Sequence, residues 1–283
     1  MQENSQRRIG EADTAKMKDH TFSICAYGES PYLENCIRSL LRQTVESNIL
    51  IVSSEPNAQI LRMSDKYGIP YYRNTGEPGI TQDWNFGYHK AHTCYVTIAH
   101  QDDIYEKSFL ENQMRALKKA DHPLIGFTDY YEIRNGEKCP GGKILKVKRL
   151  MLMPLLVRRL QSSVWTRRRI LSFGSPICCP SVTYVKDNLP HQIFQNHFQA
   201  AEDWEAWERL SVMKGEFVYT PKLLVGHRIH EGSTTSAIIH DRKRSEEELQ
   251  MFRKFWPEPL AEILGKLYAS SQDSNDLSQE ENV

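Results

Sequence analysis

The chain has 283 residues, which allows one large domain or two smaller ones. Hydrophobic residues make up 40% of the sequence and charged residues 25%, a balance typical of a globular protein with a buried core. Basic and acidic residues number 36 each, so net charge alone selects no class of partner. No apolar run approaches the roughly 20 residues that a membrane-spanning helix needs.

The six cysteines are scattered and include no Cys-x-x-Cys pair, which predicts free thiols and no zinc site. We therefore expect a reducing, cytoplasmic location. Residues 1–19 are polar and carry acids, so they are interpreted as a flexible leader rather than a signal peptide. Residues 269–283 are polar and acidic, which predicts a disordered tail.

Strands and helices alternate along most of the chain. This alternation predicts an α/β fold with a mostly parallel central sheet flanked by helices. Ligands bind such sheets beyond the carboxyl ends of the strands. Strands are predicted at 21–27, 48–54, 69–74, 94–99 and 123–133, and helices at 32–44, 58–68, 83–92 and 109–120. The main domain is expected to cover 20–240, followed by a helical extension at 241–268.

Two adjacent carboxylates, Asp102 and Asp103, directly follow the buried strand predicted at 94–99. Three roles fit such a pair. It can cap the next helix, form a salt bridge, or hold Mg²⁺ or Mn²⁺ together with the phosphates of a substrate. The pair alone leaves all three open.

Two later segments add candidate functional groups. In AEDWEAWERL, Glu202 and Asp203 begin a helix with an apolar face, so they either complement the helix dipole or supply a general base. In GHRIHEGSTTS, Arg228 and His230 lie beside a Ser/Thr cluster, and an arginine there suits phosphate recognition.

The neutral net charge conceals a basic segment. Eleven Lys and Arg residues, and no acid, lie between Glu137 and Asp187, interleaved with Leu, Met and Trp. Such a mixture indicates either a surface for anionic lipid or an anionic acceptor, or a core-packing helix with one solvated face. Within it, residues 143–169 are the candidate for peripheral contact with the inner face of the membrane. With few aromatic residues, the segment does not predict a base-stacking surface, so nucleic acid is not an expected partner.

The order and spacing of four motifs resemble glycosyltransferase family 2, from about residue 22 to about residue 235. ICAYGESPYLENCIRSLLRQT is similar to the family's opening strand, turn and helix. AHQDDIYEKSFLE resembles its DxD-type metal motif, AEDWEAWERL its ED motif, and HRIHEGSTTS its late R-x-H-x-x-S segment. The resemblance implies the GT-A fold, a nucleotide-binding α/β domain.

The resemblance also implies roles. The chain would transfer a hexosyl or N-acetylhexosaminyl group, with inversion, from a nucleotide-diphosphate sugar, and a UDP-sugar is the expected donor. The acceptor would be a glycan or a lipid-linked sugar in surface polysaccharide synthesis. Asp203 would be the base and Glu202 would orient it or the acceptor. Mn²⁺ or Mg²⁺ would be held by Asp102, Asp103 and His230. The expected donor-binding residues are Ala26, Tyr27, Gly28, Glu29, Ser53, Ser54, Asp83, Asn85, His100, Gln101, Asp102 and Arg228.

Three departures from the family pattern affect the expected donor site. The second strand ends in Ser53 and Ser54, where the family usually has aspartates, and His100 replaces the first aspartate of the metal motif. GITQDWNFGYHKA replaces a common arginine–asparagine pattern, leaving Asp83 and Asn85 as polar groups. These changes keep a non-catalytic nucleotide-sugar-binding protein as an alternative. A nucleotidyltransferase is a second alternative, which the absence of Lys and Arg from YGESPYLE disfavours.

Overall fold

The computed structural model describes residues 19–230 and 242–273. Nearly all of the predicted leader, the Ser/Thr cluster after His230, and the predicted tail beyond Asp273 lie outside the described residues. Helix α12 continues to Asp273, so the helical extension reaches past the boundary predicted at 268.

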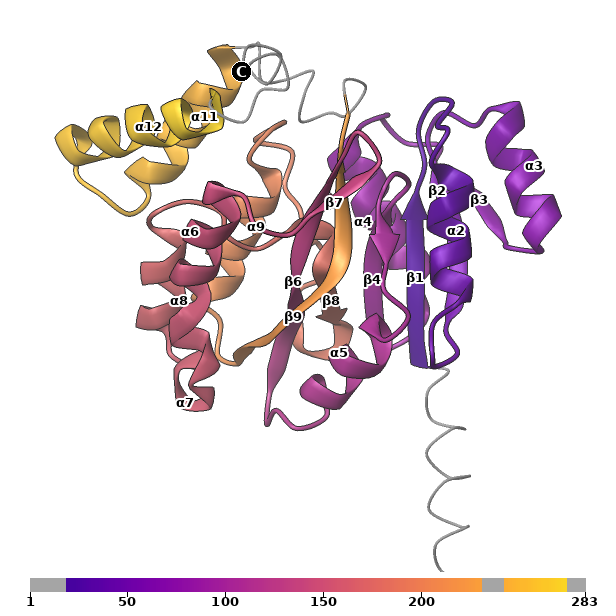
Figure 1. Ribbon diagram of the computed structural model, residues 1–283, viewed down its shortest axis with the longest axis horizontal. Helices are drawn as coiled ribbons and strands as arrows, with labels where there is room; N and C mark the ends of the chain where they lie inside the picture. Colours follow the sequence, from indigo (N-terminus) through magenta and orange to yellow (C-terminus); the bar gives the residue numbers. More distant parts are fainter. Residues whose placement is uncertain (1–18, 231–241, 274–283) are drawn as a thin grey trace, which may run out of the picture.

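The architecture is a central sheet flanked by helices, as predicted (Figure 1). The order is β3-β2-β1-β4-β8-β6-β9-β5, with β7 paired to β6. The strands are β1 (His20–Cys25), β2 (Asn48–Ser53), β3 (Tyr71–Arg73), β4 (Tyr95–His100), β5 (Ile104–Tyr105), β6 (Pro123–Arg134), β7 (Glu137–Cys139), β8 (Val182–Val185) and β9 (Glu216–Ile229).

The sheet is more mixed than the sequence predicts. Among the described strands, β1, β2, β3 and β4 pair in parallel, as do β6 and β9. The pairings β4–β8, β6–β8, β6–β7 and β5–β9 are antiparallel. The difference arises because β8 returns from a helical segment and enters between β4 and β6 in the opposite direction, which the pattern of a short apolar strand does not specify.

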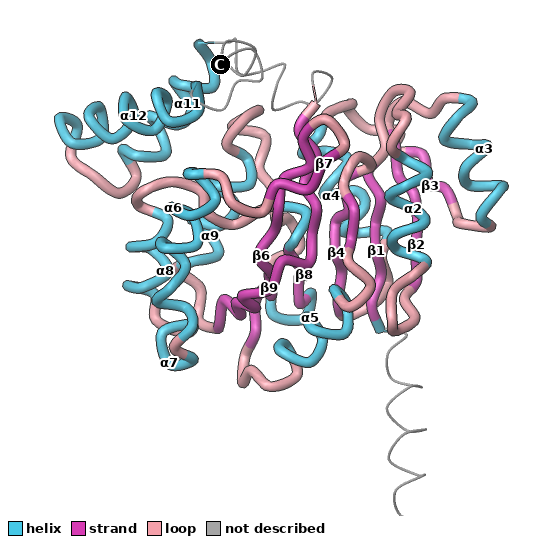
Figure 2. Tube along the Cα trace, viewed as in Figure 1, coloured by secondary structure: helices cyan, strands magenta, loops and turns pink. Residues whose placement is uncertain are grey.

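The helices cover both faces of the sheet and one flank (Figure 2). The α-helices are α2 (Leu33–Leu41), α3 (Ala58–Tyr67), α4 (Ile80–Lys90), α5 (Phe109–Leu117), α6 (Lys143–Leu152), α7 (Arg158–Gln161), α8 (Val164–Leu171), α9 (Glu202–Ser211), α11 (Arg242–Arg253) and α12 (Glu258–Asp273). Short 3₁₀ turns are η2 (Met153–Leu156), η3 (Cys179–Ser181) and η4 (Lys186–Asn188).

Local sequence explains where these helices begin and end. In α2 the buried residues Leu33, Cys36, Ile37 and Leu40 recur at helical spacing, so one face meets the sheet. Helix α3 is capped by Asn57, whose side chain accepts a hydrogen bond from the Ile60 N–H at 2.9 Å. The same helix ends at a glycine with φ of 62°, the left-handed conformation that glycine adopts without strain.

Two apolar clusters cover the two faces of the sheet. One contains residues of β2, β4, α4 and α9, including Val52, Ile98, Trp84 and Trp207. The other contains residues of β1, α2 and α5. Since both faces are buried, both strands are buried along almost their whole length: β4 is a largely apolar run, whereas β1 also carries the buried polar residues His20, Thr21 and Ser23. Functional groups on these strands are therefore confined to the strand ends.

Candidate active site

The loops after β1 and β4 are joined by a single side chain. The Gln101 side-chain amide donates to the Tyr27 carbonyl at 2.7 Å and its oxygen accepts from the Tyr27 N–H at 3.2 Å. Gly28, with φ of 59°, turns the chain away, and its carbonyl accepts from Asn57 at 2.6 Å. Tyr27 is 63% exposed and Ala26 is buried. The predicted segment 26–29 therefore forms a fixed rim beside His100 and Gln101.

A buried carboxylate lies at the end of β2. Asp83, from α4, accepts from the Ser54 N–H at 3.1 Å, the Ser54 hydroxyl at 2.9 Å and the Asn74 side chain at 2.8 Å. The adjacent Ser53 hydroxyl accepts from the Glu55 N–H. Helix α4 thus supplies a negative charge at the strand end where the sequence of β2 itself has only serines.

Asn85 has a different position from the one expected. Its amide donates to the Phe194 carbonyl at 2.8 Å and its oxygen accepts from the Phe194 N–H at 3.1 Å. Both polar atoms therefore brace the loop before α9. The neighbouring Trp84 is 9% exposed and stacks on the His100 ring, with centroids 5.1 Å apart.

Asp103 is fully buried and anchors β9 to the loop after β4. Its carboxylate accepts from the Arg228 N–H at 2.9 Å and contacts His227 Nδ1 at 3.1 Å. Burial raises the pKa of Asp103, but His227, together with His100 and the Arg228 N–H, outweighs burial and lowers it overall. Burial likewise lowers the pKa of His227, and Asp103 overrides this to raise it to about 8. These opposite shifts favour an ion pair between the fully buried Asp103 and the part-buried His227.

Asp102 is less buried than Asp103 and pairs with a different histidine. Its Oδ2 lies 3.1 Å from His230 Nε2, and the two side chains are 21% and 24% exposed. Arg228 donates from Nε to the Asp102 carbonyl at 3.0 Å, and its guanidinium lies 4.2 Å from the centre of the Tyr32 ring. Tyr32 also packs on His230, with ring centroids 5.0 Å apart. The end of β9 is thereby held over the start of α2.

The groups around Asp102 suit a divalent cation. Ligand atoms of His100, Asp102 and Asp103 lie within 4.8 Å of one another. His100 Nε2 is buried without a hydrogen-bond partner among the described residues. Burial lowers the pKa of His100 more than the two aspartates raise it, which favours the neutral ring that a metal ligand needs. Carboxylates with imidazole form a donor set that Mn²⁺ accepts.

Glu202 and Asp203 begin α9, where the sequence predicts them. Glu202 is 5% exposed, and burial, with help from the charges of Asp203 and Glu247, raises its pKa to about 7. Burial also raises the pKa of Asp203, which the charges of Lys148 and Arg244 and the Trp204 N–H offset only in part. Carboxylates with raised pKa values are suited to accepting protons near neutral pH.

The two acid pairs belong to one region of the molecule. Cys178, just before η3, has a pKa raised by burial and by the charges of both Asp103 and Asp203. Lys148 of α6 also contributes to this region. It donates to the Tyr130 hydroxyl at 3.1 Å, and its charge lowers the pKa of Asp203.

Four of these residues were not predicted as site residues. Tyr32 and His227 lie inside motifs quoted above. An aromatic residue before a helix, such as Tyr32, and a second histidine near Arg228, such as His227, do not by themselves indicate a functional role. Tyr130 and Lys148 reach the site only through the folding of β6 against α6.

Much of the basic segment supports the fold rather than facing an acceptor. Arg167, 1% exposed, donates to the carbonyls of Gly215 and Met213, each at 2.7 Å. Arg168 pairs with Glu208 at 2.6 Å, and Arg149 donates to the carbonyls of Pro140 and Tyr130. Arg167 is internal, and Arg149 and Arg168 are partly exposed but bonded to groups of the protein, so these three cations are not free to form an anionic-acceptor surface.

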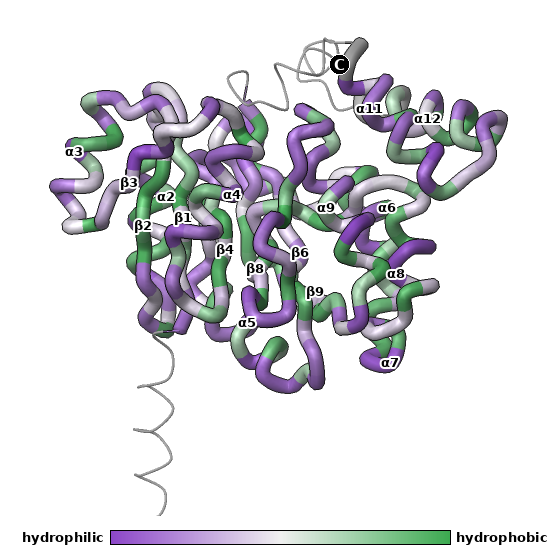
Figure 3. The backbone as a smooth tube through the Cα atoms, turned by 180° about the vertical axis from the view of Figure 1, so that it is seen from behind, coloured by the Kyte–Doolittle hydropathy of each residue, from purple (hydrophilic) through white to green (hydrophobic). Residues whose placement is uncertain are grey.

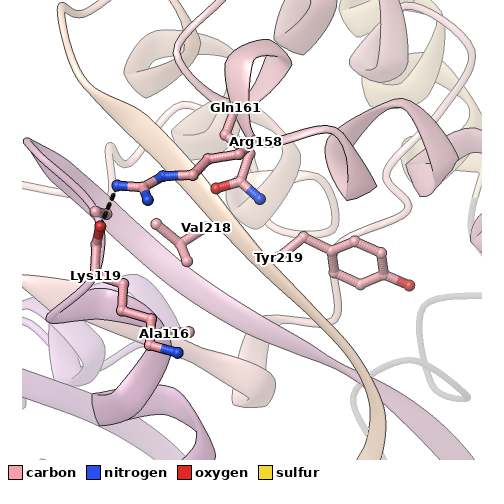
Figure 4. Close-up of a pocket in the computed structure, with 7 residues that line it drawn as sticks. Ala116, Lys119, Arg158, Gln161, Val218 and Tyr219 are labelled. Carbon is pink, nitrogen blue, oxygen red and sulfur yellow. Dashed lines mark hydrogen bonds between the residues drawn. The ribbon is translucent and has the colours of Figure 1, made fainter.

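A separate hollow of about 180 Å³ lies where α5, α7 and β9 meet (Figure 4). Arg158 crosses it to contact the Lys119 carbonyl. No carboxylate lines it, and it lies at the opposite end of the sheet from the acids described above (Figure 1). It is therefore not part of the candidate active site.

Comparison with known proteins identifies the family. Residues 21–172 match the model described as glycosyl transferase family 2. The chain belongs to glycosyltransferase family 2. It is 24% identical over 235 residues to an uncharacterized glycosyltransferase of Haemophilus influenzae, covering 80% of this chain and 70% of that protein. This family 2 chain is accordingly a glycosyltransferase.

Solved structures confirm the predicted GT-A fold. The crystal structure of S. aureus TarS 1-349 with UDP-GlcNAc aligns with a TM-score of 0.56 at 17% identity, over 87% of this chain and 70% of that one. The mannosyltransferase PcManGT from Pyrobaculum calidifontis, with GDP-Man and Mn²⁺, also gives 0.56, at 14% identity over 89% and 69%. Within the described part of this family 2 protein, none of the helices has the length and apolarity to span a bilayer.

Proposed function

We propose that this protein transfers a sugar, with inversion, from a nucleotide-diphosphate donor to an acceptor hydroxyl, and that it needs a divalent metal ion. The donor is proposed to be a UDP-sugar carrying a hexosyl or N-acetylhexosaminyl group. The TarS complex with UDP-GlcNAc and the PcManGT complex with GDP-Man and Mn²⁺ support the donor class and the metal. The acceptor is proposed to be a glycan or lipid-linked sugar in surface polysaccharide synthesis.

The donor side of the site is assigned to the strand ends of β1, β2 and β4. The rim at 26–29, where Tyr27 is exposed, would line the nucleoside, with the buried Asp83 carboxylate and Ser54 at its inner end. Asp102 and His230 would hold Mn²⁺ or Mg²⁺, supported by Asp103 and His100. When bound, the metal neutralises the negative charge of the leaving diphosphate. Arg228 is already fixed beside Asp102, where it adds a further positive charge.

The acceptor side is assigned to the start of α9. Asp203 would take the proton from the acceptor hydroxyl as that oxygen attacks the anomeric carbon. One such displacement inverts the anomeric configuration. Glu202, with a pKa near 7, is proposed to be partly protonated and to orient the acceptor or Asp203 by hydrogen bonding.

One observation carries this proposal. The two acid pairs come from segments far apart in the chain, yet the charges of Asp103 and Asp203 both raise the pKa of the Cys178 thiol. A cation-binding pair and a proton-accepting pair in one region is what a displacement at a sugar diphosphate requires, since a charged leaving group departs while a hydroxyl is deprotonated.

A binding and turnover panel tests the proposal. Purified protein is titrated with nucleoside diphosphates and their sugars, with and without Mn²⁺, and its melting temperature is followed. We expect one nucleotide to raise the melting temperature only with metal, and Asp102→Asn to abolish that shift. Asp203→Asn should keep the shift and lose transfer. No shift with any nucleotide under any metal would refute the donor assignment.

The same panel separates the alternatives. A metal-dependent shift without turnover on any sugar acceptor would favour the non-catalytic binding protein. Release of diphosphate on mixing a sugar phosphate with a nucleoside triphosphate would favour the nucleotidyltransferase.

A further inference from the structure

An unusual share of the exposed apolar surface comes from one segment. Eight of the sixteen exposed large hydrophobic side chains in the described structure lie within residues 147–173. Large exposed apolar patches on globular proteins mark binding surfaces. Seven of the eight define what we call the α6–α8 face: Val147, Leu150, Met153, Leu156, Val157, Val164 and Trp165. Trp165 is 70% exposed and Leu150 65%.

The geometry of α6 separates an outer face from an inner one. Lys143, Lys146, Val147 and Leu150 recur at helical spacing and are exposed, so they form a single outer stripe. The buried Leu145 and Leu152 lie on the other side of the same helix. The outer stripe therefore contains both cationic and apolar side chains, two of each.

The next elements continue this mixture. Exposed Arg159 follows Leu156 and Val157, and exposed Arg169 lies 5.7 Å from the centre of the Trp165 ring. Figure 3 shows hydrophobic and hydrophilic residues alternating along α6, α7 and α8. Figure 1 shows the three helices together on one flank of the sheet.

The charge of the α6–α8 face is positive. No acidic residue occurs between Glu137 and Asp187 in the sequence. Lys143, Lys146 and Arg159 form no ion pair with another described residue, although Arg158 nearby is 3.7 Å from Asp121. These cations are therefore available to an external anionic partner, unlike Arg149, Arg167 and Arg168, which bond to groups of the protein.

We propose that the α6–α8 face binds an anionic lipid bilayer. Exposed Trp, Leu and Met among Lys and Arg are the composition of surfaces that enter the lipid headgroup region, and anionic lipids attract such cations. A second copy of this chain fits less well. A symmetric dimer through this face would bring like charges together, and lysine is depleted at protein–protein contacts.

Vesicle binding tests this proposal without reference to catalysis. The full chain is sedimented with vesicles of phosphatidylcholine alone and with vesicles that also contain phosphatidylglycerol. We expect binding to the anionic vesicles to be at least about tenfold tighter, and to weaken as salt is raised. The double variant Lys146→Glu/Leu150→Asp should lose at least about tenfold of that binding.

A matched control lies on the far side of the molecule. Leu61 and Arg62 of α3 are an exposed apolar residue and an exposed cation, and Figure 1 shows α3 at the opposite edge of the sheet from α6. Leu61→Asp/Arg62→Glu should bind vesicles like the unmodified chain. All four side chains are exposed, so both double variants should unfold at nearly the same temperature as the unmodified chain.

A second readout reports contact directly. Tryptophan fluorescence should shift to the blue when anionic vesicles are added, and Trp165→Phe should remove most of the shift. Equal binding to neutral and anionic vesicles, or full binding by Lys146→Glu/Leu150→Asp, would overturn the proposal. Self-association that this variant relieves, without vesicle binding, would assign the face to a second copy of the chain instead.

Discussion

Two pairs of adjacent acids, Asp102–Asp103 and Glu202–Asp203, have opposite electrostatic surroundings. At the end of β4, the buried Asp103 meets His227 and the Arg228 N–H, and its pKa falls below the usual range. At the start of α9, burial raises the pKa of both Glu202 and Asp203. The two pairs have almost the same chemistry, but one has a cation in direct contact and the other has only distant ones.

The comparison teaches that the groups in contact with a carboxylate, rather than its residue type, decide whether its pKa is lowered or raised and so which role it suits. A carboxylate kept ionised by a paired imidazolium can stabilise a fold and support a cation site next to it. A carboxylate whose charged form is penalised by burial is suited to gaining a proton during a reaction. Four changes would break or sharpen this contrast.

The largest expected effect is on transfer by Asp203→Asn. The amide oxygen keeps an acceptor for the Trp204 N–H but the side chain can no longer take a proton. Transfer should fall by about 10² to 10⁴, the usual contribution of a general base, with donor affinity unchanged. Steady-state transfer rates and calorimetric donor titration check this. Near-normal transfer would show that another group is the base.

The next effect is on stability, through Asp103→Ala. Asp103 is fully buried, and removing its carboxylate leaves the part-buried His227 and the buried Arg228 N–H without their acceptor. The free energy of unfolding in urea should fall by about 3–5 kcal/mol. Asp102→Ala is the matched control and should cost less than about 1 kcal/mol, because its pair with His230 is partly exposed. Equal losses from both variants would contradict the division between them.

Glu202 predicts a pH dependence of stability. Its pKa rises from 4.5 to about 7 on folding, so the folded state binds the extra proton between these values. The free energy of unfolding should therefore decrease as pH rises from 4.5 to 7, by roughly 3 kcal/mol from this group. Glu202→Gln should lack that decrease. Urea titrations of both proteins across this range check it, and parallel curves would refute it.

The smallest effect is expected from Lys148→Met. The ammonium group of Lys148 lowers the pKa of Asp203 against the effect of burial, so its loss should raise that pKa. The acid limb of the pH–rate profile should move to higher pH and slow transfer a few-fold at neutral pH. Lys146→Met, on the outer stripe of α6, is the control and should leave the profile in place with a water-soluble acceptor.

Much of the fold followed from periodicity. The predicted strands and helices of the first 134 residues are present with shifted ends, because apolar spacing reports which side of an element is buried. The antiparallel entry of β8 did not follow, since a short apolar strand carries no information on its neighbours. The continuation of α12 to Asp273 was also missed, because a polar composition does not by itself end a helix.

The candidate site divides in a similar way. The sequence placed the acids and Arg228 in recognisable motifs because their order along the chain survives in the pattern. The sequence could not predict which groups these side chains would contact. The bonds of Asn85 to Phe194, Asp83 to Ser54, and Asp103 to His227 join residues distant in the chain.

The sequence by itself determined the family, the alternation of strand and helix, and the presence of two acid pairs at element ends. Only the tertiary structure decided which acid is paired with a cation, which arginines bond within the protein, and which lysines remain on the surface. The physical reason is that local propensity and periodicity act over a few residues, whereas pKa values and exposure depend on every group that folding brings within a few ångströms.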